Sequence, residues 1–219
     1  LALSLAEHGG PAAADEARAM AAAALAEAIA SAGDWDDPDL GEHAVVLARQ
    51  RQADVLTRTG DPAGARAALT DIERPADVRR ATILDLSDAF AAATAGDLAA
   101  ASGTARRAHG TLRTAGHPQE AAGAGLLLAQ CLAGAGQVAA AAEVAARAVP
   151  NLAPTPSPRR RAEAHQLLGS LLRQAGRLVE AASAYREAVA DFTAAGAEAE
   201  AAGTGYALAA IYRSLDRNL

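Results

Sequence analysis

A turn residue that recurs at an even interval constrains the fold of this chain more than any single motif does. Gly96, Gly136, Gly176 and Asp216 stand at equal distances along the sequence, and Gly60 precedes Gly96 by a slightly shorter interval. A period of about 40 residues is typical of repeat arrays, in which each unit buries its apolar face against the next unit. The spacing therefore predicts an array that grows in one direction.

The stretch from Ala162 to Ala188 shows what one unit contains. It reads as two short helices that meet at Gly176. Small residues stand where the two helices must approach closely, and larger residues fill the gaps beside them. Steps of three and four residues place these side chains on one face of each helix: Leu168, Gly169 and Leu172 in the first helix, and Ala181, Tyr185 and Ala188 in the second.

This pattern resembles the tetratricopeptide repeat, a helix–turn–helix unit. The match covers Leu168, Gly169, Ala181, Tyr185 and Ala188, and it departs where the repeat has Trp (here His165) and Tyr (here Leu172). The resemblance implies an all-α fold, a right-handed superhelix of antiparallel helix pairs. The usual period is about 34 residues, so helices about one turn longer are expected here. Repeats of this longer kind resemble those in the sensor halves of bacterial transcriptional activators and signalling ATPases.

We expect a single array over residues 1–219, with units at 1–33, 42–74, 76–116, 119–150 and 158–196 and a closing helix at 198–215. The proline-rich segment 150–158 should be a stiff, non-helical surface linker. In the unit that turns at Gly96, the signature positions fall on Ile83, Leu86, Ser87 and Phe90, which leaves two extra residues before the turn. Leu1 begins inside an apolar helical pattern, so the chain is expected to be a piece of a longer protein.

Composition and charge narrow the classes of function. The chain is 51% hydrophobic but only 3% aromatic, and its apolar residues are mostly Ala and Leu, which favours closely packed helices. Residues 1–110 hold 17 acidic and 10 basic side chains, and residues 111–219 hold 9 and 10. This balance disfavours a nucleic-acid-binding stripe. All 20 basic residues are Arg, which excludes a lysine-bearing phosphate loop and Schiff-base chemistry.

Cysteine content and hydropathy indicate a cytoplasmic protein that does not span a membrane. Cys131 is the only cysteine, so no disulfide can form within the chain, and it lies at a packing position of its helix. Neither a secretory signal nor an apolar run of spanning length is recognisable.

The sequence patterns that could form a metal-binding or catalytic site are incomplete. The acidic loop 34–41 has Asp34 and Asp36, but Pro38 breaks the calcium-loop pattern. We expect N-cap residues there, with Trp35 folded onto the array. The basic run 159–161 is expected to be solvated, and His165 falls at a packing position. The sequence indicates no enzyme, no cofactor and no metal site.

The predicted function is binding of a protein or peptide segment. In tetratricopeptide arrays, the first helix of each pair lines the concave groove, and its non-packing positions contact ligands. When these positions are carried over to this chain, they predict a groove in which Arg side chains bind a carboxylate. The predicted groove residues are Arg58, Gln130, Gln166, Ser170, Arg173, Gln174, Tyr206 and Arg213. The alternative is a ligand-sensing, regulatory module of a larger bacterial activator or signalling ATPase. An end of the array also offers a surface through which two copies of the chain can pair.

Overall fold

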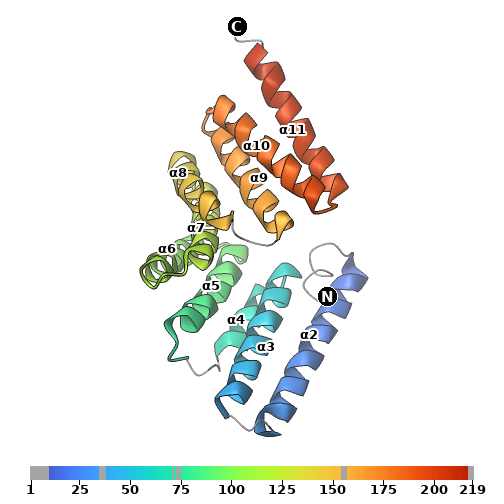
Figure 1. Ribbon diagram of the computed structural model, residues 1–219. Coiled ribbons are helices and arrows are strands. Elements are labelled where there is room, and N and C mark those ends of the chain that lie inside the picture. Colours follow the sequence, from blue (N-terminus) through green and yellow to red (C-terminus); the bar gives the residue numbers. More distant parts are fainter. Residues whose placement is uncertain (1–9, 35–37, 71, 73–74, 154–156, 217–219) are drawn as a thin grey trace. The chain divides into compact units, whose positions relative to one another are not determined.

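The chain folds into α-helices joined by short turns, as the computed structural model shows (Figure 1). Within the described residues every regular element is helical and no strand occurs, so the prediction of an all-α fold is confirmed. The structure describes residues 10–34, 38–70, 72, 75–153 and 157–216. Residues 1–9 and Trp35, for which a first helix and a plug were expected, lie outside this description.

Ten α-helices follow one another along the described chain: α2 (Pro11–Ser31), α3 (Pro38–Arg58), α4 (Pro62–Thr70), α5 (Val78–Thr94), α6 (Leu98–Thr114), α7 (Pro118–Gly134), α8 (Val138–Ala148), α9 (Pro158–Gln174), α10 (Leu178–Ala194) and α11 (Glu198–Asp216). Two short 3-10 helices accompany them: η1 (Ala32–Asp34) and η2 (Val149–Leu152).

The same type of helix C-terminus recurs along the chain and defines the repeat. Six glycines that end helices have positive φ angles of 69° to 88°: Gly60, Gly96, Gly116, Gly136, Gly176 and Gly196. At Gly136, its own N–H bonds the carbonyl of Ala133, and the N–H of Gln137 bonds that of Leu132 at 2.8 Å. This is a Schellman end, which needs a left-handed residue that only Gly adopts without strain. Five helices (α5, α6, α7, α9 and α10) have 17 residues each, so the pairs α5–α6 and α9–α10 consist of two halves of equal length, whereas α8, the partner of α7, has 11 residues.

Helix starts are fixed by capping side chains and by proline. The Asp77 carboxylate accepts a hydrogen bond from the N–H of Arg80 at 2.8 Å, and the Ser157 hydroxyl accepts one from Arg160 at 3.4 Å. These bonds satisfy donors that the helix itself leaves unpaired. Proline opens α2, α3, α4, α7 and α9, where its missing N–H costs nothing.

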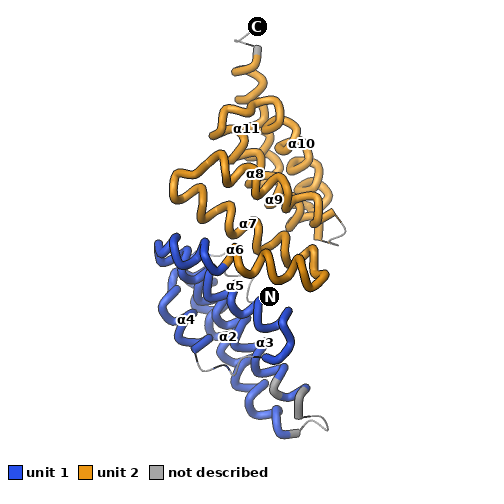
Figure 2. The backbone as a smooth tube through the Cα atoms, turned by 90° about the vertical axis from the view of Figure 1, so that its left-hand side faces the viewer, with its two compact units in different colours: residues 1–104 blue, residues 105–219 orange. Residues whose placement is uncertain are grey.

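The helices form two compact units, residues 1–104 and 105–219, and the boundary falls inside α6 (Figure 2). In the first unit α3 packs against α2, α4 and α5. In the second unit α7 packs on α8, α8 on α9, α9 on α10, and α10 on α11. Apart from α3 with α5, each of these pairs consists of helices that follow one another in the sequence, so apolar faces are buried mainly by neighbours in sequence.

The core is built from small residues at fixed distances from the glycine turns. The same four positions after the turn are buried in the second half of three successive repeats, and none is more than 4% exposed: Ala101, Ala105, Ala108 and Leu112; Ala141, Ala145, Ala148 and Leu152; Ala181, Tyr185, Ala188 and Phe192. A position five residues before the turn is also buried in every repeat, at Val55, Ala91, Cys131, Leu171 and Ile211.

Cys131 is therefore a packing residue, as predicted from its helical position. Its side chain is 1% exposed and forms no disulfide. Burial raises the pKa of its thiol, and a buried, protonated thiol is chemically inert.

Two boundaries and one helix register expected from the sequence are wrong. The expected loop 34–41 is shorter, because α3 begins at Pro38 and includes Gly41. The expected linker 150–158 is partly helical, since η2 reaches Leu152 and α9 begins at Pro158. Leu152 is 1% exposed and belongs to the core, whereas Pro150 and Asn151 are exposed.

The third correction concerns the register of α5. This helix ends at Thr94, two residues before Gly96, as α7 and α9 end two residues before their own turn glycines. It therefore has no extra residues before the turn. Counted from the turn, Ala89 and Ala92 take the positions of Gly169 and Leu172, and both are buried. The register expected from the sequence, which places Ser87 and Phe90 at these positions, is therefore wrong.

Candidate functional site

Seven of the eight predicted binding residues lie on the first helices of the second unit. They come from α7, α9 and α11, which occupy equivalent places in successive repeats. We call this set the first-helix face: Gln130, Gln166, Ser170, Arg173, Gln174, Tyr206 and Arg213. Positions four and seven residues apart share one side of a helix, so Gln166, Ser170 and Arg173 form one stripe on α9. Tyr206 and Arg213 form the matching stripe on α11.

Most of the first-helix face is open to solvent. Tyr206 is 79% exposed, which is unusual for a tyrosine in a helix that packs on its neighbours. Arg173 and Arg213, which stand at the same distance from their turns, are both exposed. Gln130 and Gln174 are exposed as well, whereas Gln166 and Ser170 are half-buried.

One side-chain hydrogen bond of the first-helix face connects α9 to α11, and a second lies within α9. The Gln166 side-chain amide donates to the Thr204 hydroxyl at 2.9 Å, and Thr204 is 1% exposed. The Gln174 amide donates to the Ser170 hydroxyl at 3.2 Å within α9. Gln166 is thus partly structural, and its remaining acceptor oxygen is the group that can meet a ligand. This contact could not be found from sequence, because it depends on which residue of the next repeat lies opposite.

Arg58 belongs to the first unit, whereas the other seven residues belong to the second unit. Its guanidinium carbon lies 5.4 Å from the centre of the Phe90 ring, a cation–π contact between α3 and α5. Beneath it, burial raises the pKa of the Asp54 carboxyl, while a hydrogen bond from Ser87 and the charge of Arg58 oppose that rise. Arg58 therefore has a structural environment of its own.

Two of the three arginines at the start of α9 are structural, which corrects the expectation that the run is simply solvated, whereas Arg160 is exposed. Arg161 pairs with Asp191 of α10 at 2.6 Å, and both side chains are largely buried, at 24% and 17% exposed. Arg159 pairs with Glu200 of α11 at 2.6 Å. The two arginines link α9 to α10 and α11, so they are not free to contact a phosphate.

His165 lies in the packed layer between α9 and α10, as predicted. Its Nδ1 atom is buried and has no hydrogen-bond partner within the described part of the chain. Burial lowers the pKa of the imidazole, and the nearby Asp191 and Glu187 carboxylates oppose this in part. The ring therefore stays neutral near neutral pH and packs as an apolar group.

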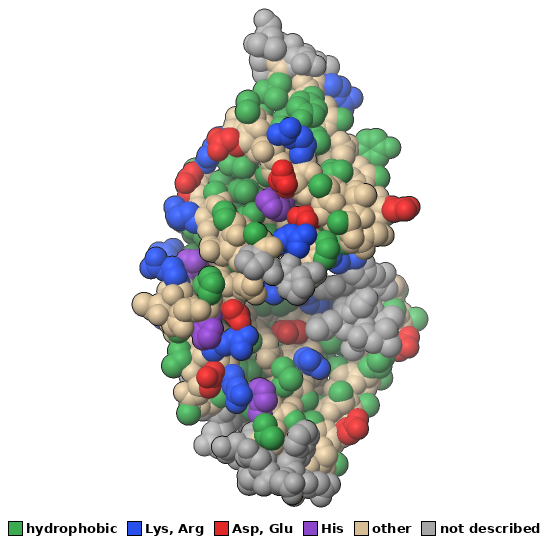
Figure 3. Space-filling model, viewed as in Figure 1, with side chains coloured by type: hydrophobic (Ala, Val, Ile, Leu, Met, Phe, Trp, Pro, Cys, Tyr) green, Lys and Arg blue, Asp and Glu red, His purple; other side chains and the backbone are tan. Residues whose placement is uncertain are grey.

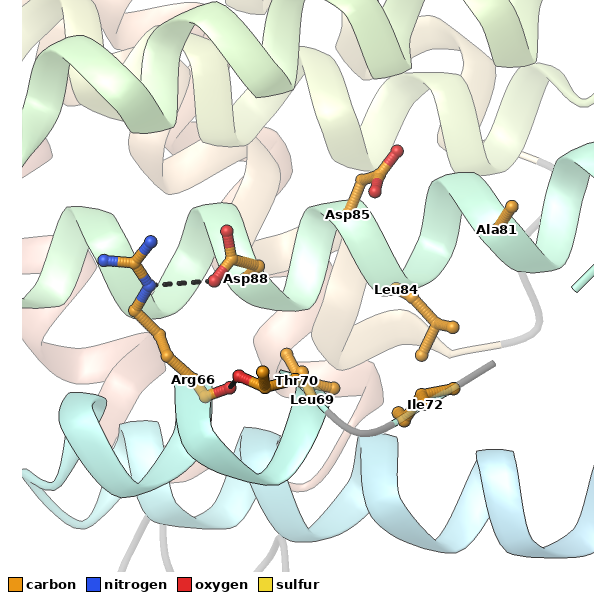
Figure 4. A pocket seen from close by; sticks show the side chains of 8 residues that line it. All are labelled: Arg66, Leu69, Thr70, Ile72, Ala81, Leu84, Asp85 and Asp88. Carbon is orange, nitrogen blue, oxygen red and sulfur yellow. Dashed lines mark hydrogen bonds and ion pairs between the residues drawn. The ribbon is translucent and has the colours of Figure 1, made fainter. Parts of the chain in front are cut away.

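A small cavity of about 240 Å³ opens between α4 and α5 in the first unit (Figure 4). Arg66 and Asp88 form an ion pair of 2.9 Å at one end, and Leu69, Ile72 and Leu84 line the other end. Ligand sites usually measure about 300–1,000 Å³, so this cavity lies just below the usual range. Sequence reasoning did not find it.

Charge is distributed without a single-signed patch on the face that Figure 3 shows, where acidic and basic side chains are mixed over both units. The described residues contain no cluster of three potential metal ligands. The acidic loop considered for calcium falls largely outside the described side chains. None of the helices that the structure describes is long and apolar enough to cross a membrane.

Comparison with known proteins supports the fold and gives no function. The chain matches no family model, and no curated protein matches it at a significant level. Among solved structures it is similar to BtubC (BKLC) from P. vanneervenii, with a TM-score of 0.65 and 17% sequence identity. That match covers 93% of this chain and 92% of BtubC. At such low identity the likeness shows a shared fold only.

Proposed function

We propose that the second unit is a non-catalytic binding module, and that its first-helix face binds a segment of another protein. The observation that carries this proposal is the exposure of Tyr206, Arg173 and Arg213 on helices of the same register. Tyrosine and arginine are the side chains that most often contribute binding energy at interfaces. A folded chain has no packing reason to leave a tyrosine 79% exposed.

The chemistry of the face favours an acidic segment. Its seven residues include two arginines and no carboxylate. A guanidinium presents donors in a planar fork that matches a carboxylate, and two of them at equivalent positions can hold two acidic groups. Gln130, Gln174 and the free oxygen of Gln166 can bond the backbone of an extended or helical segment. The mixed charge elsewhere supports a protein partner over a nucleic acid.

The proposal includes membership of the tetratricopeptide class, with a right-handed superhelix and a concave groove along the first helices. Gly169 beneath the Tyr185 ring and the buried alanines of α10 support this assignment. We place the protein in the bacterial cytoplasm, which suits a single, reduced and buried Cys131. The alternative, a regulatory module that senses a small ligand, receives less support, because the cavity between α4 and α5 lies below the usual size of a ligand site.

A display selection tests the proposed function. The chain would be screened against a library of random peptides, and the enriched peptides would be screened again against Arg173→Ala with Arg213→Ala. We expect enrichment of peptides rich in Asp and Glu that the double variant no longer retains. Arg186→Ala with Arg106→Ala, which removes two exposed arginines outside the first-helix face, is the matched control. Enrichment of peptides without acidic residues, or equal retention by both double variants, would refute the proposal.

A further inference from the structure

The repeat that turns at Gly60 has a shorter second helix than the later repeats. Helix α4 has 9 residues, whereas α6 and α10 have 17 residues each. Of the four core positions that follow the turn, only the first is buried in this repeat. Ala65 is buried, Leu69 and Ile72 are half-buried, and Ala76 is exposed. The early end of α4 thus leaves part of α5 uncovered, and the cavity between the two helices lies there (Figure 4).

The charged end of this cavity departs from the packing of the later repeats. Arg66 stands six residues after its turn, and Asp88 stands eight residues before the next turn. In the later repeats the same two positions hold apolar residues that pack in the core of the second unit: Ala142 with Leu168, and Ala182 with Leu208. An exposed ion pair adds little stability, so packing gives no reason for charges at these two positions.

The ion pair leaves part of each charged group available to a ligand. It joins Nε of Arg66 to Oδ1 of Asp88 at 2.9 Å, and the two side chains are 50% and 42% exposed. The Nη groups of Arg66 can therefore donate to a ligand, and Oδ2 of Asp88 can accept from one. Asp85 also lines the cavity, so the lining carries more negative than positive charge. This balance favours a ligand that brings an ammonium group over one that brings a carboxylate alone.

The opposite end of the cavity is apolar and small. Leu69, Ile72, Ala81 and Leu84 line it, and the Leu84 side chain points toward Ile72 (Figure 4). An apolar cavity of about 150 Å³ holds one benzene molecule. By the same measure, the cavity of about 240 Å³ has room for roughly ten non-hydrogen atoms. Leucine and isoleucine are of this size, whereas a nucleotide is far larger.

We propose that this cavity binds a free α-amino acid with an aliphatic side chain. The ammonium and carboxylate groups of such a molecule are attached to the same carbon atom, so they match the two opposite charges of a close ion pair. The ammonium group bonds Oδ2 of Asp88, and the carboxylate bonds the Nη groups of Arg66. The aliphatic side chain contacts Leu69, Ile72 and Leu84. A residue inside a peptide chain carries neither charge, so this ligand differs from the protein segment proposed for the second unit, and the two proposals are independent.

An NMR titration of the isotope-labelled 219-residue chain with L-leucine tests this inference. Because the charged end is about half exposed, we expect a dissociation constant on the order of 1 mM. Isoamylamine, which is leucine without the carboxylate, and isocaproic acid, which is leucine without the ammonium group, should each bind at least about 10-fold more weakly. Glycine, which lacks the side chain, should also bind at least about 10-fold more weakly. Binding of any of the three as tightly as leucine, or no binding of leucine up to about 20 mM, would overturn the proposal.

A double variant removes the charged end of the cavity and keeps the packing of the array. Arg66→Ala with Asp88→Leu introduces the residue types that the later repeats have at these positions, so the variant should fold and should lose leucine binding. Arg177→Ala with Glu180→Leu removes an exposed ion pair far from the cavity in sequence, and this matched control should bind leucine as wild type does. Equal leucine binding by the two double variants would overturn the proposal.

A substitution at Leu84 tests the apolar end without changing any charge. Wild type should bind leucine about 10-fold more tightly than phenylalanine, because the larger side chain exceeds the space available. Leu84→Ala enlarges this end, so the variant should bind phenylalanine more tightly than leucine. A preference for leucine that is the same in wild type and in Leu84→Ala would overturn the placement of the ligand side chain and, with it, the proposal.

Discussion

The ring of Tyr185 lies on Gly169, and this contact sets how closely α9 and α10 approach. A Cβ atom on Gly169 would lie 2.9 Å from Cδ1 of the tyrosine. Alanine is normally the better helix former by about 1 kcal/mol, so propensity alone would favour Gly169→Ala. The close contact with the ring and the higher helix propensity of Ala oppose each other at this site. The ring has little room to move, because Tyr185 is 4% exposed.

We expect Gly169→Ala to destabilise the second unit by about 1–3 kcal/mol through overpacking. Gly203→Ala, where a Cβ atom meets nothing within 4 Å, should stabilise it by about 0.5–1 kcal/mol. Urea unfolding followed by circular dichroism measures both. If both substitutions changed stability in the same direction, close packing at Gly169 would not be the dominant effect.

The ion pair between Arg161 and Asp191 should contribute more than the exposed pairs. Its side chains are 24% and 17% exposed, so water screens it less than a surface pair. A double-mutant cycle with Arg161→Ala and Asp191→Ala should give a coupling energy of about 1 kcal/mol. The same cycle on the exposed pair of Arg177 and Glu180 should give no measurable coupling. Equal coupling in the two cycles would contradict this ranking.

Mild acid should destabilise the chain in part through His165. Burial lowers the pKa of its imidazole in the folded chain, while the unfolded chain keeps a value near about 6.5. The unfolded state therefore binds a proton more readily, and stability is lost as the pH falls below about 6.5. In His165→Leu this loss should be smaller between about pH 7.5 and about pH 5. An identical pH dependence in wild type and variant would show that His165 does not titrate differently on folding.

Asp54 should affect the pH dependence of stability in the opposite sense to His165. Burial raises the pKa of its carboxyl in the folded chain, so the folded state holds the proton more tightly than the unfolded state. Its contribution to stability therefore declines as the pH rises above the unfolded value of about 3.9. Asp54→Asn keeps an acceptor for the Ser87 hydroxyl and removes the buried charge. The variant's advantage in urea unfolding should grow between about pH 4 and about pH 7; wild type being more stable at neutral pH would contradict this account.

Sequence reasoning found the helices where glycine and proline mark their ends. The closing helix expected at 198–215 corresponds to α11, which ends one residue later, at Asp216. The segment 34–41 was expected to be a loop, but Pro38 opens α3, because a proline in the first turn is compatible with a helix. Leu152 was assigned to a surface linker because of the prolines around it. Leu152 follows Gly136 at the same distance in sequence at which Phe192 follows Gly176. Counting from the turns would therefore have identified Leu152 as a core residue.

The candidate site was predictable only in part. Helical register is a local property, so the exposure of Arg173, Arg213 and Tyr206 followed from the spacing of the turns. Contacts between repeats are not local, and the bond from Gln166 to Thr204 and the ion pairs of the basic run were therefore missed. The division of the chain into two units, which separates Arg58 from the other predicted residues, also has no marker in the sequence.

Fluorescence anisotropy with one labelled acidic peptide from the display selection tests the central claim most directly. Loss of a charge-assisted hydrogen bond costs about 1.5–3 kcal/mol, so Arg173→Ala and Arg213→Ala should each weaken binding about 10- to 100-fold. Tyr206→Ala should weaken it by a similar factor, whereas Arg186→Ala on α10 should leave it unchanged. Unchanged affinity in all three variants of the first-helix face, or an equal loss in Arg186→Ala, would contradict the claim that this face binds the partner.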